Sequence, residues 1–298
     1  MTINLIDSLL RNPRIKSYYA DLAILVCSLL FAQAVIGQEL VSLFRQDQKS
    51  VSINTYSPIK DSCRGVAIIS PGAGGSEKGY AYLARSMAAQ GYLAIVVGHQ
   101  ESGQQALRQQ IRNNGLRKGL SQLITDPQVY RSRFMDIHAA KHWAEAHCNA
   151  HEFILLGHSM GAATVMLEAG AKNKLGVAGT NAFDVYVALS PQGIGLIFPP
   201  DAWTEITKPV LSITGTRDNE ELSSGTWKTR SEPFNNMPVG CKWFGIIDDA
   251  SHMNFAGIGM SQQTEALTVQ TIQAFLLRIH QHDCKSRPQI RGIEVQVK

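Results

Sequence analysis

The sequence has little charge and few aromatic residues: 17% of its 298 residues are charged and 7% are aromatic. Its hydrophobic content of 44% is still too high for an intrinsically disordered chain. Charged residues interrupt the apolar segments, which excludes a membrane protein with several spans. The Lys and Arg residues are scattered and the net charge is only +4. The basic stripe with interleaved aromatic residues that is typical of nucleic-acid-binding proteins is therefore missing.

The first 37 residues have the pattern of a secretory signal peptide. A basic leader that ends at Lys16 precedes an apolar run over residues 22–37, and Ala32 and Ala34 form an A-x-A cleavage site. The run is short for a membrane span, which needs about 20 apolar residues. An uncleaved membrane anchor is the main alternative, because the segment before the run is long. We expect a secreted or periplasmic protein, without a membrane span in the mature chain if the leader is cleaved.

Short apolar runs alternate with helical segments along the rest of the chain. Apolar strands separated by helices are typical of a mostly parallel sheet covered on both faces. We therefore predict one α/β domain over residues 38–284 and a flexible tail over residues 285–298. The predicted strands are 50–56, 65–70, 92–98, 152–156, 184–189, 210–214 and 243–247, and the predicted helices are 79–90, 129–147, 162–171 and 262–280. The polar stretch 100–126 is predicted as helix and loop.

One short motif indicates a catalytic serine. The sequence GHSMG at residues 157–161 directly follows a predicted strand and opens a predicted helix. This arrangement holds a serine on a strained turn with its hydroxyl exposed above a sheet. Any side chain at the flanking positions would collide with the neighbouring strand and helix, which explains the glycines. The motif predicts Ser159 as a nucleophile, with a simple glycine-rich turn as the alternative.

A serine hydroxyl needs a base, and the base needs an orienting acid. Three of the nine histidines follow Ser159 in the sequence: His252, His280 and His282. The last two lie at the end of the final predicted helix, where a solvated side chain is expected. His252 lies in a loop after the last predicted strand, where the base of a Ser-Asp-His chain order belongs. We predict His252 as the base.

The acid is expected in the loop after the preceding strand. Asp218 follows the predicted strand 210–214 through Gly-Thr-Arg, which puts it at the carboxyl end of that strand. We predict Asp218 as the acid. The alternatives are Glu220, Glu221, Asp248 and Asp249.

Acyl transfer also needs hydrogen-bond donors for the developing oxyanion. One donor is the backbone N–H of Met160, the residue after the nucleophile. The other is expected in the loop PGAGG at residues 71–75, where Ala73 follows the Pro-Gly turn. A phosphate-binding loop would require Gly-Lys-Ser/Thr after this segment, and the sequence GSEK at residues 75–78 does not comply.

Two further histidines lie four residues apart on a predicted helix. His138 and His142 have the spacing of a zinc-binding helix. The intervening sequence is Ala-Ala-Lys, so the glutamate of the zinc-protease motif is missing. A surface or half-buried helix face is the better interpretation, and we predict no metal site.

The chain from about residue 51 to 280 resembles the α/β-hydrolase fold. Within it, the chain resembles the esterase branch of dienelactone hydrolases, platelet-activating-factor acetylhydrolases and cutinase-like polyester hydrolases. The motifs that carry the likeness are SPGAGG at 70–75, GHSMG at 157–161 and ASH at 250–252. The resemblance implies a cofactor-free serine esterase with Ser159 as nucleophile, His252 as base, Asp218 as acid, and Ala73 and Met160 as the oxyanion hole.

Two departures from this branch leave the acyl group unassigned. Polyester hydrolases usually have an aromatic residue where Ala73 stands and a tryptophan where this chain has SPQG at 190–193. Dienelactone hydrolases typically use a cysteine where Ser159 stands. Three aromatic residues are candidates either for the substrate pocket or for the core: Trp203, Trp227 and Phe255.

Four cysteines remain after the leader, and in an exported chain they allow three disulfide pairings. In the strand order of the resembled fold, the strands that follow Cys63 and Cys148 are neighbours. Cys241 begins the last strand, and Cys284 ends the helix that runs back beside it. The resemblance therefore implies Cys63–Cys148 and Cys241–Cys284.

We conclude from the sequence that the chain is an exported, monomeric serine esterase acting on a small-molecule or polymeric carboxylic ester. One alternative is a catalytically idle protein of the same fold that binds a ligand or partner. Such proteins normally lose a catalytic residue, whereas all three positions hold suitable residues here. The other alternative is an amidase or peptidase with the same three residues.

Overall fold

The computed structural model describes residues 37–59, 63–219 and 225–298. The predicted signal peptide or anchor lies outside the described residues, apart from Gly37. Within the described ranges, no helix is both long enough and apolar enough to cross a membrane.

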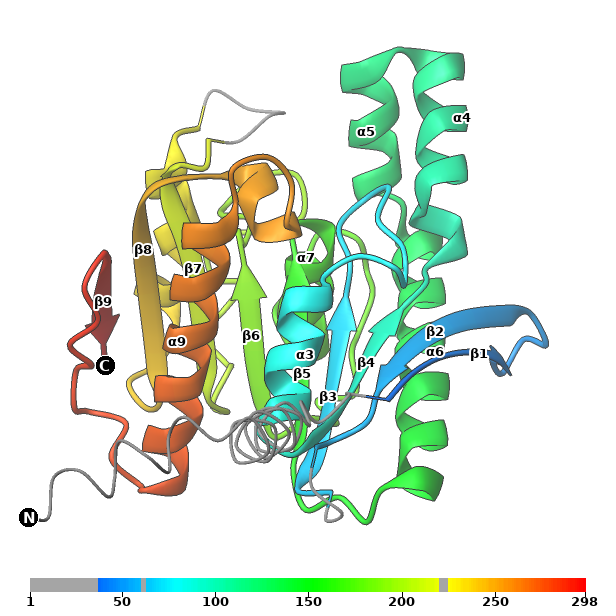
Figure 1. Cartoon of the computed structure of the whole chain (residues 1–298). Helices are drawn as coiled ribbons and strands as arrows, with labels where there is room; N and C mark the ends of the chain where they lie inside the picture. Colours follow the sequence, from blue (N-terminus) through cyan, green and yellow to red (C-terminus); the bar gives the residue numbers. More distant parts are fainter. Residues whose placement is uncertain (1–36, 60–62, 220–224) are drawn as a thin grey trace, which may run out of the picture. The chain divides into compact units, whose positions relative to one another are not determined.

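A nine-stranded sheet in the order β1-β2-β4-β3-β5-β6-β7-β8-β9 runs through the domain (Figure 1). The strands are β1 Gln38–Phe44, β2 Ser50–Tyr56, β3 Gly65–Ser70, β4 Tyr92–Val97, β5 Phe153–His158, β6 Val185–Leu189, β7 Val210–Arg217, β8 Lys242–Ser251 and β9 Ile293–Val297. The six strands from β4 to β8 are parallel to one another. The β1–β2 pair and β9 add antiparallel strands at the two edges.

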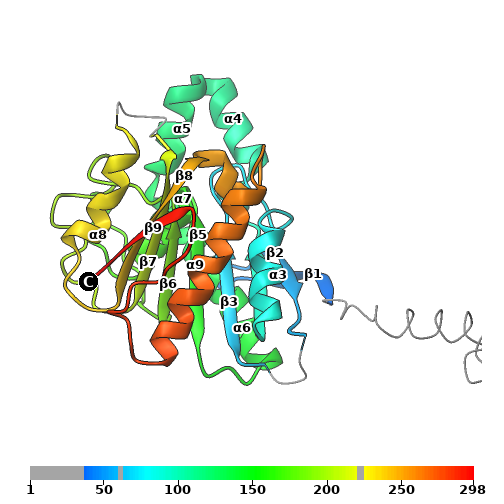
Figure 2. The ribbon, with the colours of Figure 1, turned by 60° about the vertical axis from the view of Figure 1, so that its left-hand side comes forward.

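Helices cover both faces of the sheet. The helices are α3 Ala81–Ala89, α4 Gln104–Asn114, α5 Leu116–Ile124, α6 Pro127–His147, α7 Met160–Glu168, α8 Glu232–Asn236 and α9 Gln262–His280, and the 3₁₀ turns are η1 Gln100–Ser102, η2 Trp227–Ser231 and η3 His252–Ala256. Figures 1 and 2 show α3 and α9 on one face and α6 and α7 on the other.

Successive side chains of each central strand point alternately into two hydrophobic cores. In β3, Val66 and Ile68 join the core beneath α6 and α7, whereas Ala67 and Ile69 join the core beneath α3 and α9. All four side chains are fully buried. Because successive strand residues point to opposite faces, a strand buried on both sides must be apolar throughout. Burial on both faces therefore explains the continuous apolar runs in the sequence.

The flexible tail predicted for residues 285–298 is a wrong prediction. Residues Ile293–Val297 form β9, which pairs with β8, and Val295 opposite Gly245 is 1% exposed. The strand is short and buries one side chain fully, so its apolar pattern in the sequence is weak. For the same reason β1, whose residues are mostly exposed, was not predicted. The domain therefore extends past residue 284 to the end of β9.

The structure contains both implied disulfides. Cys63, just before β3, is bonded to Cys148, just after α6, and Cys241 before β8 is bonded to Cys284 after α9. Each bond joins a strand to the end of a helix that packs on the sheet. Each therefore closes a large loop at the amino-end edge of the parallel strands, opposite the edge at which Ser159 lies.

We expect Val295→Ser to lower the free energy of unfolding by about 2 kcal/mol, because it leaves a cavity and buries a hydroxyl. Glu294→Ser, on the exposed side of the same strand, is the matched control and should change it by less than about 0.5 kcal/mol. Urea denaturation followed by circular dichroism measures both. Equal, small effects would mean that β9 does not contribute to the fold.

Candidate active site

Ser159 lies on the turn between β5 and α7, at the carboxyl edge of the parallel strands. Its φ of 55° and ψ of −119° are rare for a residue with a side chain. A Cβ added to Gly157 would lie 2.2 Å from the carbonyl oxygen of Gly161, and one added to Gly161 would lie 1.9 Å from that of Ser70. The two flanking glycines are therefore required by the close approach of strand, turn and helix.

His252 and Asp218 come together with this serine. The Nε2 atom of His252 lies 2.9 Å from Ser159 Oγ, and its Nδ1 atom lies 2.8 Å from Asp218 Oδ1. Asp218 follows β7 and is fully buried, whereas His252 begins η3 after β8 and keeps part of its ring accessible. Because a carboxylate only accepts hydrogen bonds, Nδ1 carries the hydrogen and Nε2 is free to accept the serine proton.

Two other groups hold the Asp218 carboxylate. Thr214 Oγ1 donates to Oδ2 at 2.9 Å, and Arg230 Nε lies 3.0 Å from Oδ1. With His252 Nδ1, each carboxylate oxygen has one hydrogen-bond donor, and the Arg230 guanidinium adds an ion pair to Oδ1. The orientation of the carboxylate toward the imidazole is therefore determined by buried contacts on both sides.

The predicted oxyanion donors lie in two segments that meet at the serine. Among the described residues, neither Met160 N–H nor Ala73 N–H donates a hydrogen bond to another part of the chain. A Cβ added to Gly72 would lie 3.3 Å from the Cβ of Ser159, so the Ala73 loop packs directly against the turn. Gly74 N–H donates to the carbonyl of Ser102 in η1 at 2.7 Å, which fixes the far side of this loop.

Arg230 is a site residue that the sequence did not reveal. It lies in η2, is 3% exposed, and donates from Nη1 to the carbonyl oxygens of Ser190 and Pro191 at 3.0 and 3.1 Å. Its Nε also donates to the backbone carbonyl of Asp218 at 2.8 Å. One guanidinium therefore joins the loops that follow β6 and β7. No local pattern distinguishes it from the other arginines of the chain.

A buried chain of hydrogen bonds links the Ala73 loop to the loop of the histidine. Gly72 N–H donates to Tyr80 Oη at 3.1 Å, Tyr80 Oη lies 2.8 Å from His158 Nδ1, and His158 Nε2 lies 3.1 Å from the carbonyl oxygen of His252. A carbonyl only accepts, so His158 Nε2 carries the hydrogen and Nδ1 accepts from Tyr80. These two hydrogen bonds require a neutral His158, which donates from one ring nitrogen and accepts at the other.

The protonation states of this chain follow from burial. Burial, together with the charges of His252 and Arg230, lowers the pKa of His158 well below its usual value. Burial raises the pKa of Tyr80 to about 12, so its hydroxyl keeps the proton that it donates. Tyr80 also has a φ of 56°, a left-handed conformation that is uncommon for a residue with a side chain.

A second Ser-His-Asp arrangement lies behind the Ala73 loop. Ser70 Oγ lies 2.9 Å from His99 Nε2, and His99 Nδ1 lies 2.9 Å from Asp136 Oδ2. All three residues are buried, and Arg133 donates to Ser70 Oγ and to the carbonyl of Pro71. No substrate can reach this serine, so the arrangement supports the loop after β3. Burial lowers the pKa of His99 to about 4.

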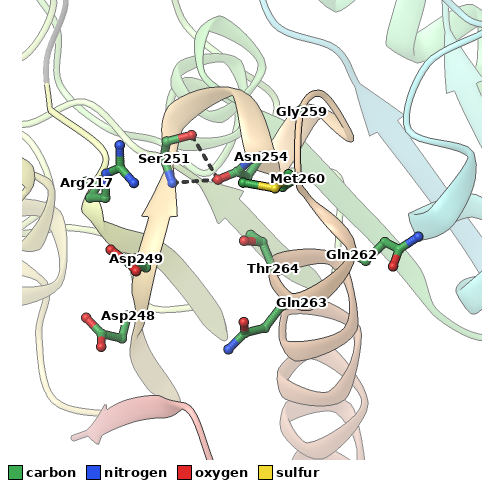
Figure 3. A pocket seen from close by; sticks show the side chains of 10 residues that line it. All are labelled: Arg217, Asp248, Asp249, Ser251, Asn254, Gly259, Met260, Gln262, Gln263 and Thr264. Carbon is green, nitrogen blue, oxygen red and sulfur yellow. Dashed lines mark hydrogen bonds between the residues drawn. The ribbon is translucent and has the colours of Figure 1, made fainter.

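Two of the alternative acids, Asp248 and Asp249, do not contact His252. Asp248 and Asp249 are exposed at the end of β8, and Asp248 accepts from Thr216 Oγ1 at 3.0 Å. Both line a cavity of about 810 Å³. Figure 3 shows them on the same strand as Ser251, with Asn254 nearby. Glu220 and Glu221 lie outside the described residues.

The remaining candidates are separate from Ser159. His142 is 92% exposed and lies 3.6 Å from Glu145, whereas His138 lies 3.8 Å from the buried Glu168, so the two histidines contact different carboxylates. His280 contacts Glu152 near the start of β5. Of the three pocket candidates, Trp203 and Phe255 are fully buried core residues and Trp227 is half-buried beside α8.

Solved structures with the same arrangement of strands and helices are known. An alpha-beta serine hydrolase homologue from Coxiella burnetii is 15% identical, with a TM-score of 0.53 over 80% of this chain and 99% of its own. An esterase domain of a Rhodothermus marinus protein is 14% identical, with a TM-score of 0.55 over 81% of this chain and 99% of its own. The chain has the α/β-hydrolase fold. No protein-family model and no curated protein matches the sequence.

The buried arrangement of Ser70, His99 and Asp136 predicts that the stability of the protein depends on pH. The folded state takes up a proton on His99 only near pH 4, whereas an unfolded histidine does so near 6.5. Between these values the unfolded state binds more protons, so the free energy of unfolding falls as the pH falls, by about 2 kcal/mol at pH 5. Urea denaturation at pH 7 and pH 5 measures it.

His99→Gln should reduce this difference between pH 7 and pH 5, although the variant is less stable at both values. His142→Gln removes an exposed histidine and should keep the wild-type difference. If His99→Gln left the difference unchanged, the pH dependence would have another source.

Proposed function

We propose that the chain is a serine hydrolase that cleaves carboxylic esters through an acyl-enzyme. The observation that carries the proposal is the unbroken series of contacts from Ser159 Oγ through His252 to the buried carboxylate of Asp218. The α/β-hydrolase fold and the motifs at residues 70–75 and 250–252 support it. They also favour the branch of dienelactone hydrolases, platelet-activating-factor acetylhydrolases and cutinase-like esterases.

In the acylation step, Ser159 Oγ attacks the ester carbonyl while His252 Nε2 takes its proton. Asp218 accepts from Nδ1 and stabilises the imidazolium that forms. The N–H groups of Met160 and Ala73 donate to the carbonyl oxygen as it becomes an oxyanion. The imidazolium then protonates the leaving alcohol, which departs and leaves the acyl group on Ser159.

In the deacylation step, His252 takes a proton from water as the water attacks the acyl carbonyl. The same two N–H groups stabilise the second oxyanion, and the proton returns to Ser159 Oγ as the acid leaves. Each bond cleavage is completed by residues of this chain. The reaction requires no cofactor, because the oxyanion donors and the imidazole supply the charge stabilisation.

Three buried residues act as positioning residues in this proposal. Arg230 holds the Asp218 loop, and Tyr80 with His158 connects the Ala73 loop to the backbone of His252. None of them contacts Ser159 Oγ or His252 Nε2, and Arg230 Nη2 lies 3.3 Å from the other ring nitrogen of His252, Nδ1. Their effect is to keep donors and base in one geometry during both steps, which is the main source of electrostatic catalysis.

The two disulfides favour an oxidising compartment, and we propose that the protein is exported. The apolar run over residues 22–37, with its A-x-A site, supports the same proposal. An exported hydrolase would meet its ester substrate outside the cytosol.

We expect the protein to hydrolyse p-nitrophenyl esters, from acetate to palmitate, and Ser159→Ala to abolish this activity. The reason is that no other accessible hydroxyl among the described residues contacts a histidine–aspartate pair. Asp218→Asn should reduce kcat about 10⁴-fold, because the imidazole loses its orienting carboxylate. Ser70→Ala, in the buried arrangement, is the matched control and should retain Ser159-dependent hydrolysis. Full activity in Ser159→Ala would contradict the proposal.

Tyr80→Phe should lower kcat about tenfold and leave KM nearly unchanged, because the Ala73 loop matters most when the oxyanion forms. Tyr186→Phe removes a hydroxyl that donates to Asn181 far from Ser159, and serves as the control. Steady-state kinetics with p-nitrophenyl acetate, well below the melting temperature of each variant, measures both. A rise in KM at constant kcat would contradict a role in oxyanion positioning.

A further inference from the structure

The helical hairpin formed by α4 and α5 holds the whole excess positive charge of the protein. Residues 104–124 contain four cations and no acidic residue. The complete chain has 28 cationic and 24 acidic residues, so outside the hairpin the two numbers are equal. The four cations are spaced along the sequence, and the turn at Gly115 between the helices brings them onto one small element. They are Arg108, Arg112, Arg117 and Lys118.

The hairpin has an apolar side toward the protein and a cationic side toward solvent. Leu107, Leu123 and Ile124 pack against the core beneath α6 and α7. Arg108, Arg112 and Lys118 are exposed, and no carboxylate of the described residues lies within ion-pair distance of them. Helices with this division, apolar on one side and Lys/Arg-rich on the other, bind anionic lipid surfaces.

The end of the hairpin exposes an apolar side chain among these cations. Leu116, at the turn, is 68% exposed and is followed directly by Arg117 and Lys118. The hairpin contains no Phe, Tyr or Trp on which the bases of a nucleic acid or the rings of a sugar could stack. A leucine surrounded by cations is suited to a surface that is anionic outside and apolar beneath.

The hairpin stands beside the proposed active site. Leu107 of α4 lies against Gly74, the neighbour of Ala73: a Cβ added to Gly74 would lie 2.6 Å from its side chain. Helix α4 therefore packs on the Ala73 loop. The hairpin follows β4 and η1, and Figure 1 shows it extending beyond the carboxyl ends of the parallel strands. The loop after β8 at the same edge has three more exposed apolar residues: Met253, Ile258 and Met260.

We propose that the α4–α5 hairpin docks the protein on an anionic lipid surface. The cations attract the surface, at about 1 kcal/mol for each charge near it, and Leu116 enters its apolar layer. Docking would bring the edge that carries Ser159 to the lipid. Together with the proposed function, this assigns esters held in an anionic lipid layer as the substrate class.

The test places a fluorescent reporter at the hairpin end. Leu116→Trp is made in the full-length Ser159→Ala chain, which prevents hydrolysis of the lipid. Its emission is quenched with brominated phosphatidylcholine, in vesicles with and without phosphatidylglycerol. We expect quenching only with phosphatidylglycerol, and loss of quenching at high salt. Val239→Trp, at an 80% exposed position before β8, is the matched control and should not be quenched.

A charge variant tests the cations themselves. Arg108→Gln, Arg112→Gln and Lys118→Gln together, in the same reporter chain, should weaken vesicle binding about 100-fold, as the loss of three surface charges requires. The control variant removes three exposed cations between α9 and β9: Lys285→Gln, Arg287→Gln and Arg291→Gln. It should bind as the parent does. Equal binding by both variants, or equal quenching on neutral vesicles, would overturn the proposal.

Lipid docking and ester hydrolysis can be tested independently of each other. With Ser159 intact, the hairpin charge variant should hydrolyse dissolved p-nitrophenyl acetate at the wild-type rate, because its substitutions lie outside the catalytic contacts. If the wild type hydrolyses no ester, the proposed function fails, while the quenching result stands on its own. If the chain binds a DNA oligonucleotide more tightly than anionic vesicles, the lipid assignment is overturned.

Discussion

The close packing of the β5–α7 turn against the end of β3 is the constraint on which the rest of the site depends. There is no space for a side chain at Gly161, which faces the carbonyl of Ser70, and little at Gly72, which faces Ser159. This packing brings the loop that contains Ala73 against the turn that carries Ser159 and Met160, although the two segments are far apart in the sequence. It also holds Ser159 at a positive φ, a conformation that an unconstrained turn would not keep.

The irregular backbone at the carboxyl edge of the sheet is held by two buried arginines. Arg133 donates to the carbonyl of Pro71 after β3, and Arg230 donates to the carbonyls of Ser190 and Pro191 after β6. Carbonyl groups past the ends of strands have lost their ladder partners, and a guanidinium offers five donors in a planar fork. Each arginine therefore satisfies several buried acceptors at once, which keeps these loops rigid without regular secondary structure.

Most of the α/β fold could be predicted because it depends on local patterns. The strands buried on both faces, such as β3 and β4, are continuous apolar runs, and α9 has the period of a helix packed on one side. The edge strands β1 and β9 were missed because an edge strand buries few side chains, so its sequence carries little apolar signal. The prediction of a flexible tail failed for this reason.

The motif around Ser159 and the chain order of the candidate acid and base can be read from the sequence alone, because turn chemistry and strand ends are local properties. Which of the two Ser-His-Asp arrangements is accessible depends on the packing of the folded chain: Ser70 is fully buried, whereas Ser159 is partly exposed. The packing also decides the contacts of His158, whose partner His252 lies 94 residues away. Burial and hydrogen bonding between distant segments depend on how the elements pack, and residue types alone do not contain that information.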